Sequence, residues 1–320
     1  MEREINYTIS PYPFTGIPTF LRAPVVPPAQ LTGKGFRIGV MGVPFDEGCP
    51  FIPGSRFCAR AIREQSLRFG EGYYDHQLKK FMLEKEMKAG LLVDAGDVTI
   101  LPTDVEGNFK RTTDMARELL DRGLLLVALG GDHSISYPVV RAFREPLHVI
   151  HLDAHADFLP ILPGYENTNT HPFRHISEME HVKSLTQIGY RSIREASGLD
   201  SIRAGNRVIG MDEFRNMGED ECLSGIPEES RCYVSIDIDV LDCGLVPGCV
   251  SAEPDGMSYP QLRSLLRFIA KKFHVVGFDM VEVCPPLDVP AQTTAYLASQ
   301  LVVEFLGNIC DQPRWNAEKA

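Results

Sequence analysis

Short apolar runs rich in β-branched residues alternate along the chain with segments of helical periodicity. The run Leu124–Leu129 is apolar throughout, and Leu147–Leu152 is apolar except for His148 and His151; such runs are typical of strands buried on both faces of a parallel sheet. The pattern predicts strands over 36–43, 91–94, 124–129, 147–152, 186–190, 208–211, 233–239 and 274–280, and helices over 55–69, 112–122, 137–143, 259–272 and 293–308. This order predicts a three-layer α/β/α fold, with helices on both faces of a mostly parallel central sheet.

The two ends of the chain differ from this alternating pattern. Six prolines lie within the first 30 residues, and they predict an extended segment with little regular structure. We therefore divide the chain into a proline-rich arm over 1–35, a single α/β domain over 36–310 and a short tail over 311–320.

Composition narrows the class of protein. The net charge of −11 argues against a nucleic-acid binder, which needs a basic surface. No apolar run approaches the roughly 18 residues of a membrane span, and the charged residues Glu2, Arg3 and Glu4 do not fit a signal peptide. The eight cysteines show no C-x-x-C spacing, so reduced thiols are expected. These observations predict a cytoplasmic protein without a membrane partner.

Three short segments concentrate side chains that bind metals, and each follows an apolar run. They are Gly-Gly-Asp-His at 130–133, Asp-Ala-His-Ala-Asp at 153–157 and Asp-Ile-Asp at 237–239. Because ligand sites in open α/β sheets lie beyond the carboxyl ends of the strands, these side chains are expected to converge. Asp132 is expected to cap a helix instead. The remaining carboxylates and imidazoles, with no thiolate nearby, suit manganese or another borderline divalent ion. The predicted ligands are His133, Asp153, His155, Asp157, Asp237 and Asp239.

Further motifs occur in the same order as in a known family. They include Gly-Val-Pro-Phe-Asp at 42–46, Pro-Gly-Ser-Arg at 53–56, Gly-Gly-Asp-His-Ser at 130–134, Ser-Ile-Asp-Ile-Asp-Val-Leu-Asp at 235–242 and Gly-Phe-Asp-Met-Val-Glu-Val at 277–283. From about Gly39 to Asn308 the chain resembles the ureohydrolases, the group of arginase, agmatinase and guanidinobutyrase, and within it the agmatinase-like branch. Members of this group are usually trimers or hexamers, so a homo-oligomer is expected.

The resemblance implies two manganese ions per subunit, with nickel or cobalt as alternatives. His133, Asp153, Asp157 and Asp237 would hold one ion, and Asp153, His155, Asp237 and Asp239 the other. The implied reaction is hydrolysis of a guanidino compound to urea and an amine. Asp157 would orient the attacking water and pass on its proton, Glu282 would bind the guanidinium group, and His171 would contact the substrate and shuttle protons, with His175 as a fallback.

The chain departs from the family pattern directly after His171 and in the loops that follow Asp157 and Asp242, and these two loops are expected to meet the substrate tail. Pro172 replaces a glycine after His171, and Cys249–Ala252 replaces a Thr-Gly-Thr type of stretch. Agmatine is the favoured substrate, with Glu166 or Glu253 as acceptors for its ammonium group. The alternatives are arginine, guanidine, alkylguanidines and guanidino acids such as guanidinobutyrate and guanidinopropionate; for an acid, Arg174 or Arg56 would supply the cation. A single-zinc deacetylase and a non-catalytic paralogue remain less favoured hypotheses. The other five histidines, His76, His148, His151, His181 and His274, are expected to be structural or exposed.

Overall fold

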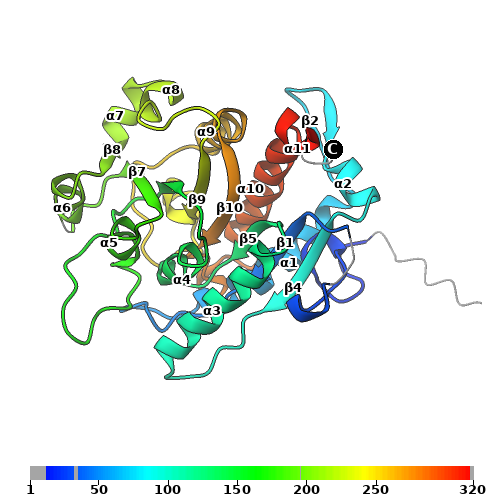
Figure 1. Ribbon diagram of the computed structural model, residues 1–320, viewed down its shortest axis with the longest axis horizontal. Helices are drawn as coiled ribbons and strands as arrows, with labels where there is room; N and C mark the ends of the chain where they lie inside the picture. The colour runs from blue at the N-terminus through cyan, green and yellow to red at the C-terminus, as the bar shows by residue number, and fades with distance from the viewer. Residues whose placement is uncertain (1–11, 32–34, 195, 318–320) are drawn as a thin grey trace, which may run out of the picture.

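Eight parallel strands form the central sheet of the computed structural model, which describes residues 12–31, 35–194 and 196–317. Their order across the sheet is β4-β1-β5-β10-β9-β6-β7-β8. Figure 1 shows β8 beside α6, α7 and α8, at the opposite end of the molecule from β4. The strands are β1 (Ile38–Gly42), β4 (Leu92–Asp97), β5 (Leu125–Leu129), β6 (Leu147–Leu152), β7 (Val182–Tyr190), β8 (Arg207–Gly210), β9 (Arg231–Asp237) and β10 (His274–Val281).

Helices cover both faces of this sheet, and two hydrophobic cores result. In β5 the alternation of side chains is direct, because Val127 and Leu129 enter one core while Leu126 and Ala128 enter the other. The first core also contains apolar residues of α1 (Cys58–Ser66), α9 (Tyr259–Lys272) and α10 (Thr293–Cys310); the second contains those of α3 (Val105–Leu120), α4 (Ser136–Val140) and α5 (Pro172–Ser177). The predicted three-layer α/β/α class is therefore confirmed.

The remaining elements are short and mostly peripheral. They are the antiparallel hairpin of β2 (Tyr73–Asp75) and β3 (Lys80–Met82), and the helices α2 (Glu84–Lys88), α6 (Ser197–Arg203), α7 (Met211–Asn216), α8 (Glu219–Cys222) and α11 (Pro313–Ala317). Among the described residues, no helix is both long and apolar enough to cross a membrane. All eight cysteines are free thiols, as predicted.

The described part of the proline-rich segment packs onto the sheet. Phe20 and Leu21 are fully buried, and their backbone N–H groups donate to Asp94 Oδ2 and Ser66 Oγ, both at 2.9 Å. At the other end, Trp315 is buried beneath the guanidinium of Arg37, 3.7 Å from the ring centroid. The division into arm, domain and tail stays a prediction, and residues 1–11, 32–34 and 318–320 lie outside the described residues.

Candidate metal centre

Four neighbouring strands bring the predicted ligands to one edge of the sheet. Because β5, β10, β9 and β6 are adjacent and parallel, the residues that follow them meet at their carboxyl ends. His133 follows β5, Asp153 follows β6 and Asp237 ends β9. Asp132 caps the 3-10 turn that starts at His133 by accepting from the N–H of Ser134 at 3.0 Å, as the sequence predicted.

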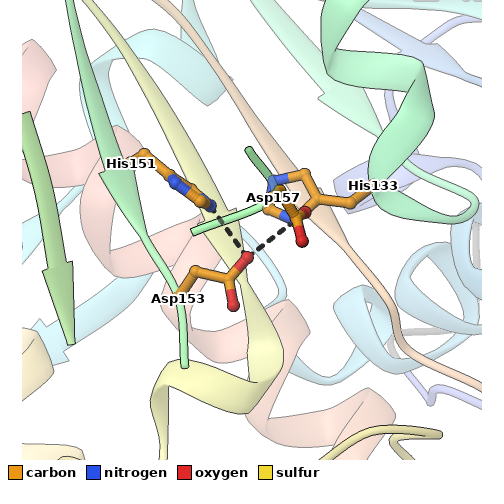
Figure 2. A group of neighbouring side chains, drawn as sticks. All are labelled: His133, His151, Asp153 and Asp157. Atoms are coloured by element: carbon orange, nitrogen blue, oxygen red, sulfur yellow. Dashed lines mark hydrogen bonds and ion pairs between the residues drawn. The ribbon is translucent and has the colours of Figure 1, made fainter. Parts of the chain in front are cut away.

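The six predicted ligands form one continuous cluster. His133 Nδ1 lies 2.9 Å from Asp153 Oδ2 and 3.1 Å from both Asp157 Oδ2 and Asp237 Oδ2. Figure 2 shows Asp153 between His133 and His151, with Asp157 closing the group. His155 Nδ1 lies 3.2 Å from the other oxygen of Asp153 and 3.1 Å from Asp239 Oδ2.

Asp153 therefore faces both histidines, one with each carboxylate oxygen. His133, Asp153 and Asp157 are grouped closely enough to hold one ion, and Asp153, His155 and Asp239 are grouped closely enough to hold another. The shared position of Asp153 is what a carboxylate between two ions requires. Donor chemistry and burial both fit a pair of divalent cations.

Electrostatics support this fit. Burial, aided by neighbouring Asp153, raises the pKa of Asp157 to about 7, and burial also raises the pKa values of Asp237 and Asp239. Despite its own burial, the Asp153 carboxyl has a pKa held well below its usual range by the surrounding histidines. Asp239 and Asp153 outweigh burial at His155 and raise its pKa to about 12. So many carboxylates in one buried cluster need compensating positive charge, which protons or metal ions can supply.

Backbone conformation is unusual at two of the functional positions. Asp157 has φ 47° and Glu282 has φ 64°, both in the left-handed region that non-glycine residues seldom occupy. Such conformations cost of order 1–3 kcal/mol and persist where the surroundings enforce them, often at functional sites.

A second layer of polar residues fixes the orientation of His133. Its Nε2 lies 2.9 Å from Ser235 Oγ, and Ser235 donates to Asp279 Oδ1 at 2.7 Å. Asp279 also accepts from Tyr233 Oη at 2.6 Å and from Ser136 Oγ at 2.7 Å. A carboxylate that holds a histidine through a hydrogen-bond chain sets which ring nitrogen faces the metal side.

His151 belongs to the same outer layer, and the sequence did not connect it to the site. It is fully buried, its Nε2 lies 2.8 Å from Asp153 Oδ2, and its ring stacks on Phe173 with centroids 3.5 Å apart. His151 is grouped with His133, Asp153 and Asp157 as a side chain that could itself hold a metal ion, so the expectation that it is structural or exposed stays a prediction; its hydrogen bond positions Asp153. The sequence did contain an indication of this contact, because positions 151, 153, 155 and 157 are spaced by two residues, and side chains at that spacing in a strand point to the same face.

A cavity of about 220 Å³ opens onto the cluster, and Glu282 lines it together with His155, Asp157, Asp237 and Asp239. Glu282 is buried. Its Oε1 accepts from the His133 N–H at 2.8 Å and from Asn169 Nδ2 at 3.0 Å, and its Oε2 accepts from Ser55 Oγ at 3.2 Å. A carboxylate fixed beside the cluster is suited to bind a cationic group of the substrate.

His171 occupies a different place. It caps α5, directly before Pro172 at the first helical position. Its Nε2 lies 3.0 Å from the carbonyl of Pro160 and its Nδ1 lies 2.5 Å from Thr168 Oγ1. His171 is not among the residues that line the cavity, so its proton-shuttling role stays a prediction. The fallback, His175, contacts the Glu166 carbonyl at 2.7 Å and also lies outside the cavity lining.

Of the four residues predicted to meet the substrate tail, Glu253 alone approaches the cluster, with its Oε1 3.6 Å from His155 Nε2. The other three are engaged elsewhere. The Glu166 carboxylate accepts a hydrogen bond from the N–H of Gly164. Arg174 donates to the carbonyls of Phe158 and Leu159, and Arg56 pairs with Asp46. The cation that does line the cavity is Arg194, which the sequence did not single out.

Fold and site together define a three-layer α/β/α protein with a buried cluster of carboxylates and imidazoles that could hold metal ions, and comparison with known proteins makes the class specific. Residues 36–307 match the model of the arginase family. Proclavaminate amidinohydrolase of Streptomyces clavuligerus is 34% identical over 96% of each chain, and guanidinopropionase of Pseudomonas aeruginosa is 33% identical over 92% of each. The solved structure of the Streptomyces clavuligerus amidinohydrolase superposes with a TM-score of 0.80 at 30% identity, covering 93% of this chain and 98% of that one.

The chain belongs to the arginase family. The resemblance identified in the sequence is thus confirmed. Members of the family are hydrolases that cleave C–N bonds of guanidino compounds and release urea, and this chain is a guanidino hydrolase of that class.

Proposed function

We propose that the chain hydrolyses a guanidino compound to urea and an amine with the help of two divalent metal ions. The observation that carries the proposal is the position of Asp153, which turns one oxygen toward His133 and the other toward His155. His133, Asp153, Asp157 and Asp237 would hold one ion, and Asp153, His155, Asp237 and Asp239 the other. When bound, such a pair lowers the pKa of water strongly enough to supply a nucleophile near neutral pH.

Manganese is the ion that we propose, with nickel or cobalt as alternatives. The donors in contact with one another are carboxylates and imidazoles, which suit these ions. The Cys249 thiol also lies close to Asp237 and Asp239, and a sulfur donor there would favour nickel or cobalt over manganese. Metal preference is therefore part of the proposal that has to be measured.

The residues around the cluster take the roles that the family resemblance implies. Glu282 anchors the guanidinium group, because its buried carboxylate lines the same cavity as Asp157. Asp157 orients the attacking water and passes a proton to the leaving amine. We retain His171 as the proposed proton shuttle, although its ring contacts its own loop, so a movement of residues 159–171 would be part of that role.

The sequence favours agmatine as the substrate, in a homo-oligomer of three or six cytoplasmic subunits, without nucleic-acid or membrane partners. These finer statements rest on the resemblance and on composition.

The test is urea release across agmatine, arginine, guanidino acids, guanidine and alkylguanidines, using protein loaded separately with manganese, nickel or cobalt. Asp153→Ala is expected to abolish both metal binding and urea release. Arg203→Gln, a change of an exposed ion-paired arginine on α6, serves as a control that should leave both unchanged. Failure of the metal-loaded protein to release urea from any of these compounds would refute the proposal and would favour a non-catalytic paralogue. Activity with a single zinc on acetylated amines would favour the deacetylase hypothesis.

A further inference from the structure

The charges around the cavity are distributed unevenly. It is lined by the carboxylates of Asp157, Asp237, Asp239 and Glu282. Among the described residues that line it, Arg194 is the one lysine or arginine. Arg194 follows β7, three residues after Arg191. The cavity therefore offers anionic groups to one part of a ligand and a cation to another.

Arg194 is held in place by specific contacts. Its Nε–H donates to Glu253 Oε1 at 2.9 Å, and its Nη2 lies 2.7 Å from His155 Nε2 and 3.5 Å from the carbonyl oxygen of Ser251. Glu253 is in turn fixed by Ser192 Oγ at 3.2 Å. The side chain of Arg194 is 57% exposed, whereas that of Glu253 is 15% exposed. The guanidinium group is thus oriented by a partly buried partner but remains within reach of a ligand.

We infer that Arg194 binds a carboxylate at the end of the substrate remote from the guanidinium group. The inference rests on the proposed function and selects one class among its substrates: short guanidino carboxylic acids, in preference to agmatine. A planar guanidinium with several donors matches a carboxylate, and a cavity of about 220 Å³ suits a small molecule.

An ammonium tail fits this wall poorly. Arg194 would repel it, and the nearby acceptor, Glu253, already receives hydrogen bonds at Oε1 from Arg194 and Ser192. Glu253 is also absent from the cavity lining, and Glu166 accepts a hydrogen bond from its own loop. A neutral alkyl tail would avoid the repulsion but would gain nothing from the guanidinium group.

The experiment compares urea release by the metal-loaded wild type and Arg194→Gln with three guanidines of similar length: 4-guanidinobutyrate, agmatine and butylguanidine. The wild type is expected to prefer the carboxylate. Loss of one charge-assisted contact predicts a fall of about 10- to 100-fold in kcat/KM for the carboxylate, mainly through KM. Butylguanidine should be unaffected, agmatine should be used equally well or better, and Arg194→Lys should retain part of the preference.

Two results would overturn the inference. One is a wild type that prefers agmatine or butylguanidine. The other is an equal loss with all three compounds in Arg194→Gln, which would mean that Arg194 only fastens the loop containing Ser251 and Glu253.

If the wild type releases urea from none of them, the proposed function fails, and calorimetric binding of 4-guanidinobutyrate still decides the role of Arg194. Binding at least tenfold weaker in Arg194→Gln than in wild type and in the Arg203→Gln control would support a carboxylate site. Equal binding, or no binding to the wild type, would exclude one.

Discussion

Replacing Glu282 by glutamine removes a buried negative charge from the cavity while preserving the shape of the side chain. In the structure, Oε1 of Glu282 accepts from the backbone N–H of His133 and from Asn169, while Oε2 accepts from Ser55. Glutamine keeps one acceptor oxygen, which can retain the bond from His133. Its amide group cannot form a paired, charge-assisted contact with a substrate guanidinium.

The expected loss follows from that contact. A hydrogen bond to a charged group contributes about 1.5–3 kcal/mol, so losing one predicts a fall of roughly 10- to 150-fold in kcat/KM. The protein itself should not be destabilised. Burial raises the pKa of Glu282, which means that its ionised form is disfavoured in the folded protein, and the neutral amide removes that penalty. Loss of activity with unchanged or higher thermal stability is therefore predicted, as at many functional sites.

The assay measures urea release, bound metal and the midpoint of thermal unfolding on the same preparations. Glu86→Gln is a matched control, because Glu86 is also buried but bonds to Trp315, away from the cavity. The control should retain full kcat/KM. If Glu282→Gln turns over every guanidine at the wild-type rate, Glu282 does not anchor the guanidinium group. A parallel loss of metal would instead place Glu282 in the support of the metal centre.

Two further predictions concern the metal centre. Asp279→Asn disturbs the hydrogen bonds that link Asp279 through Ser235 to His133. It should therefore weaken metal binding by about 10- to 100-fold, which chelator competition measures. An unchanged metal affinity would show that Asp279 does not support the metal centre. For the metal-free protein, burial raises the pKa of Asp157 to about 7 and Asp239 helps raise that of His155 to about 12, so both bind protons more tightly when folded. His151, whose pKa burial lowers to about 4, acts in the opposite sense up to its ordinary value of 6.5. The unfolding free energy of the metal-free protein should therefore fall as pH rises from about 6.5 to about 8, and manganese should stabilise the protein increasingly over that range. Thermal unfolding without and with metal checks this, and a rise for the metal-free protein over that range would contradict it.

The strands were predictable because their sequences are mostly apolar and end in polar residues. The strand over 147–152 and the helix over 259–272 match the structure at both ends. The helix expected over 112–122 begins earlier, at Val105, because Asp104 caps it by accepting from the N–H of Gly107 at 3.2 Å. The hairpin of β2 and β3 was missed, since strands of three residues carry too little periodicity to be recognised.

The metal cluster was predictable for a topological reason. Parallel strands place their carboxyl ends at one edge, so His133 and Asp237, which are 104 residues apart in sequence, could be expected to meet. The contacts of the residues around the metal cluster depend instead on tertiary packing, which the sequence pattern does not reveal. His151 supports Asp153 because Phe173 stacks on it, and Arg194 reaches the cavity because Glu253 holds it. Sequence reasoning chose Arg174 and Arg56 as candidate cations, and both are engaged elsewhere by backbone carbonyls and by Asp46.

The number of metal ions bound per chain tests the central claim most directly. It can be measured by elemental analysis after reconstitution with manganese and removal of free metal. The wild type is predicted to bind about two ions per chain, and Asp153→Ala fewer than about one, because Asp153 faces both histidines. Fewer than about one ion in the wild type, or an unchanged count in Asp153→Ala, would contradict the account.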